Sequence, residues 1–326
     1  MFLSIIIPTR NRADLLASAL ESLVLQSLAT SEYEVLVIDN GSSDHTAEVI
    51  VNYQVKLRNL RGIFASEPGL HTGRHAGMKA AQGDVLVFAD DDIEALPTWL
   101  ASIKEAFSDA SVAMVGGNNL PMFLEPPPRW LLKMWRGRSR QGMRLLPALS
   151  IIELSCNQRE ISPHLIWGCN FSIRKDVLLA AGGFHPDGMP GELIRFRGDG
   201  ETHVSDYVKR SGMKSVFHAG ATVYHKVTPE RMTSEYFRQR GFNQGVSDSY
   251  TALRNQNKSD IQVRRSLLRR AAGWGLRKFR DVMRDREVKY ALEQMQLGYS
   301  EGYAYHQEVY REDSEVRVWV HQEKYF

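Results

Sequence analysis

The sequence predicts an α/β protein with a mostly parallel central sheet flanked by helices, followed by a helical extension at the C-terminus. Short apolar runs recur along the first part of the chain, and turn-forming residues follow them. Between these runs lie segments with apolar residues at helical spacing, an alternation typical of right-handed βαβ units. With 326 residues, 43% hydrophobic and 24% charged, the chain has the composition of a globular protein of about two domains.

The predicted elements follow one another closely. The expected strands are the apolar runs at residues 3–7, 33–38, 61–65 and 85–89. A helix is expected after each of the first three strands: Asn11 would cap the first, Asp44 precedes the second, and the third covers residues 73–81. In the C-terminal part, residues 228–253 are expected to be helical.

The ends of these strands indicate where a ligand would bind. In parallel α/β sheets the ligand lies at the carboxyl ends of the strands. This rule selects residues 8–12, 39–44 and 90–92, which follow three different strands. We therefore expect these segments to meet at one edge of the sheet.

The acidic triplet Asp90, Asp91 and Asp92 is the strongest chemical signal. It directly follows an apolar strand and has no basic residue beside it in the sequence. Crowding of this kind raises a carboxylate pKa unless a cation neutralises the charge, and a hard divalent ion that also contacts substrate phosphates is suited to the role. A solvated acidic turn is the alternative, and the triplet alone does not decide between them.

Several segments, in order, resemble the family 2 glycosyltransferases with the GT-A fold: SIIIPTRNR, VLVIDNGSSDHT and GRHAGMKAAQGDVLVFADDD. Further along, GCNFSIRKDVLLAAGGF, GDGETHVSDYVKRSG and TVYH are similar to the acceptor-side blocks of that family. The resemblance implies a GT-A-like catalytic domain over residues 1–226, with a nucleotide-sugar half (1–95) and an acceptor half (96–226). Residues 227–326 would then form a mainly helical extension.

The resemblance also implies residues that bind the nucleotide sugar: Pro8, Thr9, Arg10 and Asn11 in the first nucleotide-contacting loop, Asp39 at the base, Arg74 near the diphosphate, and Asp91 within the triplet. Two positions depart from the family pattern. Asn40 replaces a second acidic residue, which leaves the choice of base open, and His75 replaces an asparagine. Each of these residues also has a structural interpretation as a turn former, helix cap or solvated side chain.

The resemblance assigns the metal to Asp90 and Asp92, the ends of an Asp-x-Asp signature, with His225 as a further ligand. The expected ion is Mn²⁺ or Mg²⁺, and imidazole suits manganese better. The general base would be Glu201, with Asp199 as its competitor, because the family's Glu-Asp motif is shifted here. A carboxylate at a helix start can also be purely stabilising.

The implied activity is inverting transfer of a sugar from a nucleoside diphosphate sugar, usually UDP-linked, to a hydroxyl of a glycan or lipid-linked acceptor. One alternative is a sugar nucleotidyltransferase, which would need a glycine-rich, lysine-containing phosphate loop after the first strand, and PTRNR contains no glycine. The other is a protein that binds nucleotide sugars or carbohydrates without catalysis.

Charge and apolar patterning bear on partners and location. The net charge of +3 does not favour nucleic acid as a partner. Cys156 and Cys169 are interpreted as buried free thiols.

The N-terminus lacks a basic leader and no run of about 18 apolar residues occurs, so a cytoplasmic protein is expected. Residues 264–289 are basic with interleaved apolar residues, which suits either peripheral contact with the inner face of the cell membrane or a solvated helix face, and an oligomer remains open.

Overall fold

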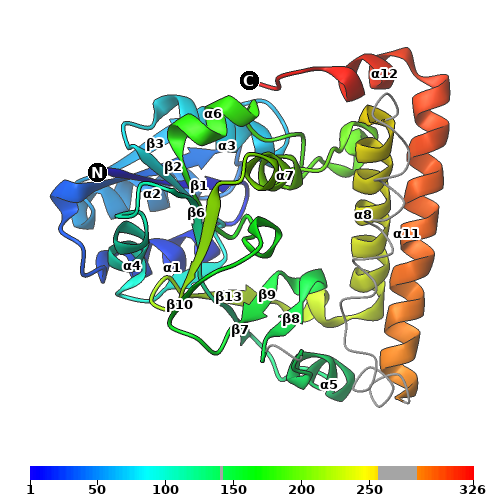
Figure 1. The fold of residues 1–326 in the computed structure, drawn as a ribbon, viewed down its shortest axis with the longest axis horizontal. Coiled ribbons are helices and arrows are strands. Elements are labelled where there is room, and N and C mark those ends of the chain that lie inside the picture. The colour runs from blue at the N-terminus through cyan, green and yellow to red at the C-terminus, as the bar shows by residue number, and fades with distance from the viewer. Residues whose placement is uncertain (140–141, 256–284) are drawn as a thin grey trace.

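The computed structural model describes residues 1–139, 142–255 and 285–326, and an eight-stranded sheet runs through this part (Figure 1). Its strand order is β10, β12, β6, β11, β4, β1, β2, β3. The bounds are β1 Leu3–Thr9, β2 Tyr33–Asp39, β3 Leu60–Phe64, β4 Val85–Ala89, β6 Val112–Gly116, β10 Gln158–Glu160, β11 Asn170–Arg174 and β12 Lys214–His218. Strands β1 to β4 pair in parallel, as predicted, whereas β11 lies antiparallel between β4 and β6.

A second, five-stranded sheet has the order β5, β13, β7, β9, β8, and the sequence patterns did not predict it. Its strands are β5 Ile93–Ala95, β7 Asn119–Phe123, β8 Arg144–Leu146, β9 Ile151–Glu153 and β13 Val223–Val227. Strand β5 begins directly after the acidic triplet, and β4 of the central sheet ends directly before it. The triplet therefore lies where the chain passes from one sheet to the other.

Helices cover both faces of the central sheet. Their bounds are α1 Ala13–Val24, α2 Thr46–Lys56, α3 Leu70–Ala80, α4 Trp99–Ala106, α6 Lys175–Ala181 and α7 Thr202–Arg210. Helices α1, α2 and α4 pack against one face, where Leu3, Ile5 and Ile7 point, and α3, α6 and α7 pack against the other, where Ile6 points. Because both faces are covered, the strands are continuous apolar runs without alternation.

The turn after β1 differs from the prediction. The N-cap of α1 is Arg12, and Asn11 has a left-handed backbone with φ of 52°. The carboxylate of Asp44 accepts the hydrogen bond from Ala13 N at 3.1 Å and so takes the capping role expected of Asn11. Asn11 instead accepts a hydrogen bond from Ser43 N at 2.7 Å, which ties the loops after β1 and β2 together.

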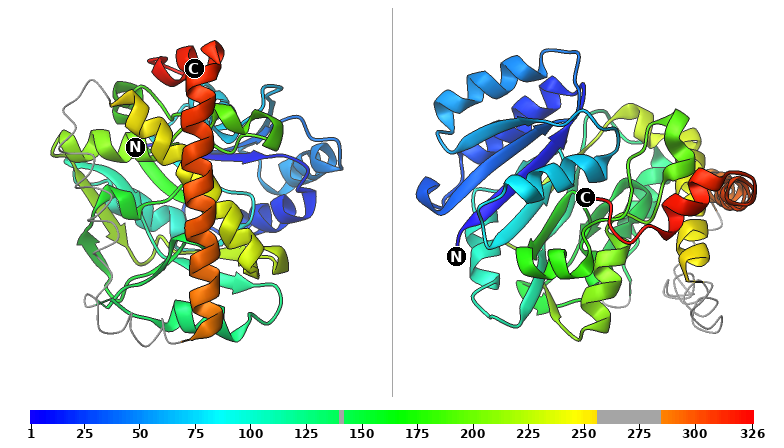
Figure 2. Two further views of the ribbon diagram at one scale, coloured as in Figure 1. Left: turned by 90° about the vertical axis from the view of Figure 1, so that its right-hand side faces the viewer. Right: turned by 90° about the horizontal axis from the view of Figure 1, so that it is seen from above.

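The C-terminal part is helical, as predicted, with α8 Ser234–Arg254, α11 Arg286–Glu312 and α12 Ser314–His321, while α5 Arg129–Arg136 lies near the second sheet (Figure 1). Helices α8 and α11 lie side by side in both views (Figures 1 and 2). Glycines allow this close contact: a Cβ atom at Gly245 would lie 2.1 Å from the carbonyl oxygen of Tyr299, and one at Gly298 2.0 Å from that of Arg238.

The chain end returns to the part of the chain that holds the central sheet (Figure 2). The hydroxyl of Tyr325 contacts that of Tyr250 on α8 at 2.8 Å, and the carbonyl oxygen of Tyr325 contacts Nδ1 of His75 on α3 at 3.2 Å. The ring of Phe326 lies 5.1 Å from that of His75. The last residues therefore join the helical extension to the helix that carries Arg74.

The basic segment predicted at residues 264–289 lies outside the described residues, except for residues 285–289. Within the ranges that the structure describes, none of the helices combines the length and the apolar character needed to cross a bilayer.

The close packing of α8 on α11 predicts a stability defect in the Gly245→Ala variant. The new methyl group would overlap the backbone of α11, and the resulting separation of the helices should cost about 1–3 kcal/mol despite the better helix propensity of alanine. Thermal melts should show a lower melting temperature than the wild type. Gly191→Ala is the matched control, since a Cβ atom there meets nothing within 4 Å. Equal melting temperatures for the two variants would contradict the packing argument.

Candidate active site

The carboxyl ends of β1, β2 and β4 meet at one edge of the central sheet, as predicted, and border a pocket of about 230 Å³. Five of the predicted site residues lie in its wall: Pro8, Thr9, Arg10, Asp90 and Asp91. Gly188 and Pro190 from a distant loop form part of the same wall. The pocket is therefore formed by segments within residues 8–91 together with residues 188–190.

The acidic triplet has a basic partner that its immediate sequence did not indicate. The guanidinium of Arg12 lies 2.6 Å from a carboxylate oxygen of Asp91 and 2.8 Å from one of Asp92. Thr9 Oγ1 donates a further hydrogen bond to Asp91 at 2.8 Å. Burial raises the pKa of Asp91, and the charge of Arg12 opposes that shift. The left-handed turn at Asn11 follows the end of β1 and leads directly to Arg12.

Asp92 is held by three cationic or polar groups from distant segments. Besides Arg12, its carboxylate contacts Arg231 at 3.3 Å and Nε2 of His225 at 3.1 Å. Burial alone would raise the pKa of Asp92, but the hydrogen bond and charge of His225, together with both arginines, hold it below its usual value. His225 lies in the interior of β13 rather than at a strand end, so its side chain is fixed by the second sheet.

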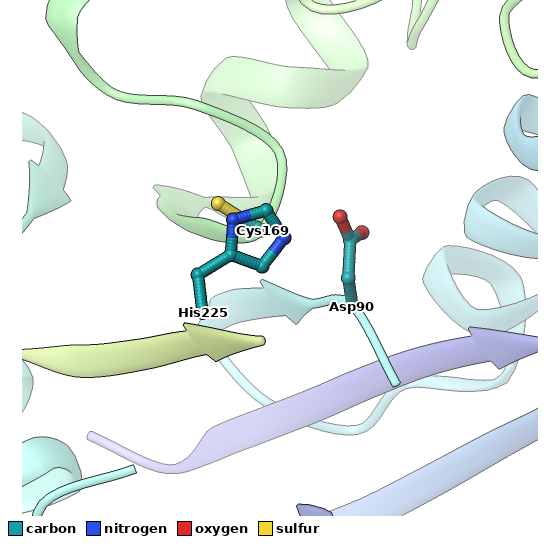
Figure 3. Close-up of side chains that lie close together, drawn as sticks. All are labelled: Asp90, Cys169 and His225. Carbon is teal, nitrogen blue, oxygen red and sulfur yellow. The ribbon is translucent and has the colours of Figure 1, made fainter. Parts of the chain in front are cut away.

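Asp90 forms a compact group with His225 and Cys169 (Figure 3). One ligand atom from each of these side chains lies within 4.8 Å of the other two. Cys169 is buried, as predicted, whereas Cys156 is only partly buried, which corrects the prediction for that thiol. Burial and the neighbouring Asp92 raise the pKa of Asp90, against the opposing charge of Arg74.

The donor atoms here fit a divalent cation. Nε2 of His225 lies 3.1 Å from Asp92 Oδ1, and a carboxylate in that position orients an imidazole whose other nitrogen binds a metal. Among the described residues, Nδ1 of His225 is buried without a hydrogen-bond partner. Carboxylate and imidazole together suit manganese among the ions expected at this site.

Arg74 connects the triplet to the predicted base. Its buried guanidinium lies 3.6 Å from Asp90 and 3.4 Å from Glu201, and packs over the ring of Phe184 at 5.3 Å. Gly168 allows this placement, because a Cβ atom there would lie 2.1 Å from Arg74. Glu201 also accepts a hydrogen bond from Gly168 N at 3.3 Å.

The two candidate bases have different surroundings. Asp199 is 9% exposed, lies 2.6 Å from Nδ1 of His185 and accepts a hydrogen bond from Thr251 Oγ1 at 2.7 Å. Burial raises its pKa, but the contacts with His185 and Thr251 outweigh burial and lower it. The side chain of Glu201 is 25% exposed and faces Arg74. This geometry favours Glu201 for contact with a substrate and a structural role for Asp199.

The remaining predicted nucleotide contacts lie around the same edge. Asp39 Oδ1 accepts a hydrogen bond from Ser42 N at 2.8 Å at the end of β2. Arg10 is exposed at the pocket wall. Asn40 is buried and donates to the carbonyl oxygens of Ala65 and Glu67 at 2.9 and 2.7 Å, so it shapes the loop after β3.

Sequence patterns selected residues 8–12 for this edge but gave Arg12 no role, and they missed Arg231 and Cys169 as members of this site. Arg12 lies within the PTRNR segment, and its position just past the turn is the signal that indicates it. Arg231 lies in the short 3-10 helix Pro229–Met232 after β13 and has no local signal. Cys169 directly precedes β11, whose antiparallel insertion beside β4 brings it close to the triplet.

The chain is similar to known glycosyltransferases. Residues 4–178 match the family model described as glycosyl transferase family 2. Glycosyltransferase AglE of Haloferax volcanii is 35% identical over 118 residues, which are 36% of this chain and 39% of that protein. Validoxylamine A glucosyltransferase of Streptomyces hygroscopicus subsp. jinggangensis is 29% identical over 210 residues, 59% of this chain and 49% of that protein. The chain thus spans less than half the length of these curated relatives.

Solved structures show the same fold at low sequence identity. The mannosyltransferase PcManGT from Pyrobaculum calidifontis, in complex with GDP-Man and Mn²⁺, aligns with a TM-score of 0.55 and 16% identity over 98% of this chain and 83% of its own. Residues 1–349 of S. aureus TarS, in complex with UDP-GlcNAc, align with a TM-score of 0.51 and 16% identity over 96% of this chain and 92% of that one. The predicted GT-A-like α/β fold is confirmed.

The family model covers more than half of the chain, and the fold agrees with that of the solved glycosyltransferases. This chain belongs to glycosyl transferase family 2.

Proposed function

We propose that this protein transfers a sugar from a nucleoside diphosphate sugar to a hydroxyl group of an acceptor, with inversion at the anomeric carbon. The observation that carries the proposal is the position of Arg74 between Asp90 and Glu201, at 3.6 and 3.4 Å. One buried guanidinium thus separates the acidic triplet from a partly exposed carboxylate. The diphosphate and the attacking hydroxyl would bind on opposite sides of it.

The donor would bind in the pocket at the edge of the central sheet. Pro8, Thr9, Arg10 and Asn11 would contact the nucleotide, with Asp39 at the base. The complexes of PcManGT with GDP-Man and of TarS with UDP-GlcNAc support a nucleotide-sugar donor. Because those donors carry different bases, our expectation of a UDP-linked sugar rests on Asp39.

Asp90, Asp92 and His225 would hold a divalent ion, Mn²⁺ by preference, beside the diphosphate. When bound, the ion supplies Lewis-acid stabilisation of the negative charge on the leaving diphosphate. Arg74, buried at 3% exposure, supplies a fixed positive charge to the same group. Arg12 and Arg231 hold Asp91 and Asp92 in place for this purpose.

Glu201 would take the proton from the acceptor hydroxyl as its oxygen attacks the anomeric carbon. Its position at the N-cap of α7 and its contact with Gly168 N restrain the carboxylate beside Arg74. The acceptor would be a glycan or a lipid-linked glycan, and in the second case residues 264–289 would contact the membrane surface on its cytoplasmic side.

Replacing the proposed base predicts a loss of turnover without a loss of binding. In Glu201→Gln, the rate of sugar transfer should fall at least about 100-fold, because general-base catalysis contributes roughly 10²- to 10⁴-fold. Binding of the nucleotide, measured by calorimetry, should change little. Unchanged turnover would remove Glu201 from the mechanism.

Asp199→Asn separates the two candidate carboxylates. Since Asp199 is buried against His185 and Thr251, this variant should lower the melting temperature, with a cost of about 1–3 kcal/mol. Its turnover should fall much less than that of Glu201→Gln. A stable Asp199→Asn variant with no turnover, beside an active Glu201→Gln variant, would reverse the assignment.

Donor binding should depend on a divalent ion. In a thermal-shift screen of nucleoside diphosphate sugars, the cognate donor should raise the melting temperature with Mn²⁺ present and much less with a chelator, because ligand at about 100 times its Kd stabilises by about 2.7 kcal/mol. Asp90→Asn should abolish the part of this rise in melting temperature that depends on Mn²⁺. The control Asp14→Asn, whose side chain is 95% exposed, should retain it. Equal stabilisation with and without the chelator would mean that the arginines replace the metal.

A further inference from the structure

We propose that Cys169 is a ligand of the metal ion at this site, and that its sulfur makes the site prefer softer divalent ions over Mg²⁺. The proposal rests on the proposed function, because it concerns the ion that would accompany the donor. The proposal adds a thiolate to ligands that are otherwise carboxylate and imidazole. This addition would determine which divalent ion the chain binds.

The three side chains converge from separate parts of the fold (Figure 3). Asp90 follows β4 of the central sheet, His225 lies on β13 of the second sheet, and Cys169 immediately precedes β11. Their ligand atoms all lie within 4.8 Å of one another. Bonds of about 2.0–2.3 Å place two ligands of one ion up to roughly 4.5 Å apart, so side-chain adjustments of a few tenths of an ångström bring all three onto one ion.

Cys169 differs from an ordinary core cysteine in its polar surroundings. Its sulfur accepts a hydrogen bond from Asn119 Nδ2 at 3.2 Å, and both side chains are 2% exposed. A sulfur that accepts a buried amide hydrogen bond has an outer partner of the kind that orients metal ligands and stabilises a thiolate. The carbonyl oxygen of Ser150, 3.8 Å from the sulfur, accepts the weak hydrogen bond from the uncoordinated thiol.

His225 supplies the independent observation that a ligand belongs here. Its ring is 2% exposed, and Nδ1 has no hydrogen-bond partner among the described residues. Leaving a buried polar atom unpaired costs free energy, about 1–3 kcal/mol, unless a bound group satisfies it. Nε2 contacts Asp92, and this contact fixes the plane of the ring beside Cys169 and Asp90.

Coordination changes the sulfur chemically and thereby sets the choice of metal. The thiol loses its proton to solvent as the sulfur–metal bond forms, so the site gains one negative charge together with the two positive charges of the ion. Thiolate and imidazole ligands favour ions softer than magnesium, with zinc and iron at the soft end and manganese between them and magnesium, whereas magnesium prefers oxygen ligands and retains its water. A site with only Asp90 and Asp92 would accept Mg²⁺ far more readily.

Cobalt spectroscopy on a variant with a single cysteine tests the proposal. The chain has two cysteines, so Cys156→Ser leaves Cys169 as the sole source of a thiolate. Co²⁺ titrated into this variant, in the presence of UDP, should produce a sulfur-to-cobalt charge-transfer band in the near ultraviolet. Equilibrium dialysis with metal analysis on the same samples measures how much Co²⁺ is bound. Bound cobalt without that band, or the absence of bound cobalt, would overturn the proposal.

A second pair of variants measures the selectivity. Cys169→Ser should weaken Co²⁺ binding by about 10- to 100-fold, the range known for the removal of groups that support a metal ligand, and should change Mg²⁺ binding by less than about twofold. Cys156→Ser should leave both affinities unchanged. The charge-transfer band reports the bond and not turnover, so a protein that shows the band but transfers no sugar would reject the proposed function and retain the metal ligand.

Discussion

The neutralisation of three adjacent carboxylates is the interaction on which the rest of this structure depends. Asp91 and Asp92 are 2% and 4% exposed, and isolated charges at that depth would cost several kcal/mol each. Arg12 and Arg231 lie against them, from the turn after β1 and from the segment after β13. Because these arginines follow strands of different sheets, both are in place only when the two sheets are assembled. Charge pairing therefore couples the two sheets.

The need to pair buried polar groups also involves the C-terminal helices. Asp199 needs Thr251 of α8 as a hydrogen-bond donor, and His75 of α3 contacts the backbone of Tyr325 near the chain end. Buried polar groups must be paired, so the extension completes the catalytic domain instead of forming a separate module. Arg74 lies one residue before His75 on the same helix. The contact with the chain end thus supports the helix that positions the guanidinium between Asp90 and Glu201.

Local sequence patterns predicted those parts of the fold and site that depend on neighbouring residues. The runs at β1 to β4 were predictable because burial on both faces demands continuous apolar sequence, and their order implied a common edge. Strand β11 was not predictable from such patterns. It pairs antiparallel with β4 but lies about 80 residues further along the chain, and pairing at that distance leaves no periodic signal in the sequence. The second sheet consists of strands of three to five residues, too short to show alternation. Because the second sheet was not predicted, Arg231, which follows strand β13 of that sheet, was missed as well.

The charges at this site indicate which negative groups the arginines would neutralise and which a divalent ion would neutralise. Asp90, Asp91 and Asp92 face three guanidiniums, so the triplet is close to neutral before any substrate binds. Glu201 and an incoming diphosphate both add negative charge, and Arg74 already contacts two carboxylates. A neutral cluster attracts a divalent ion weakly, whereas a cluster that has received a diphosphate attracts it strongly. A divalent ion bound here would therefore enter with the donor and leave with the nucleotide, and the buried arginines would hold the carboxylates in position between turnovers.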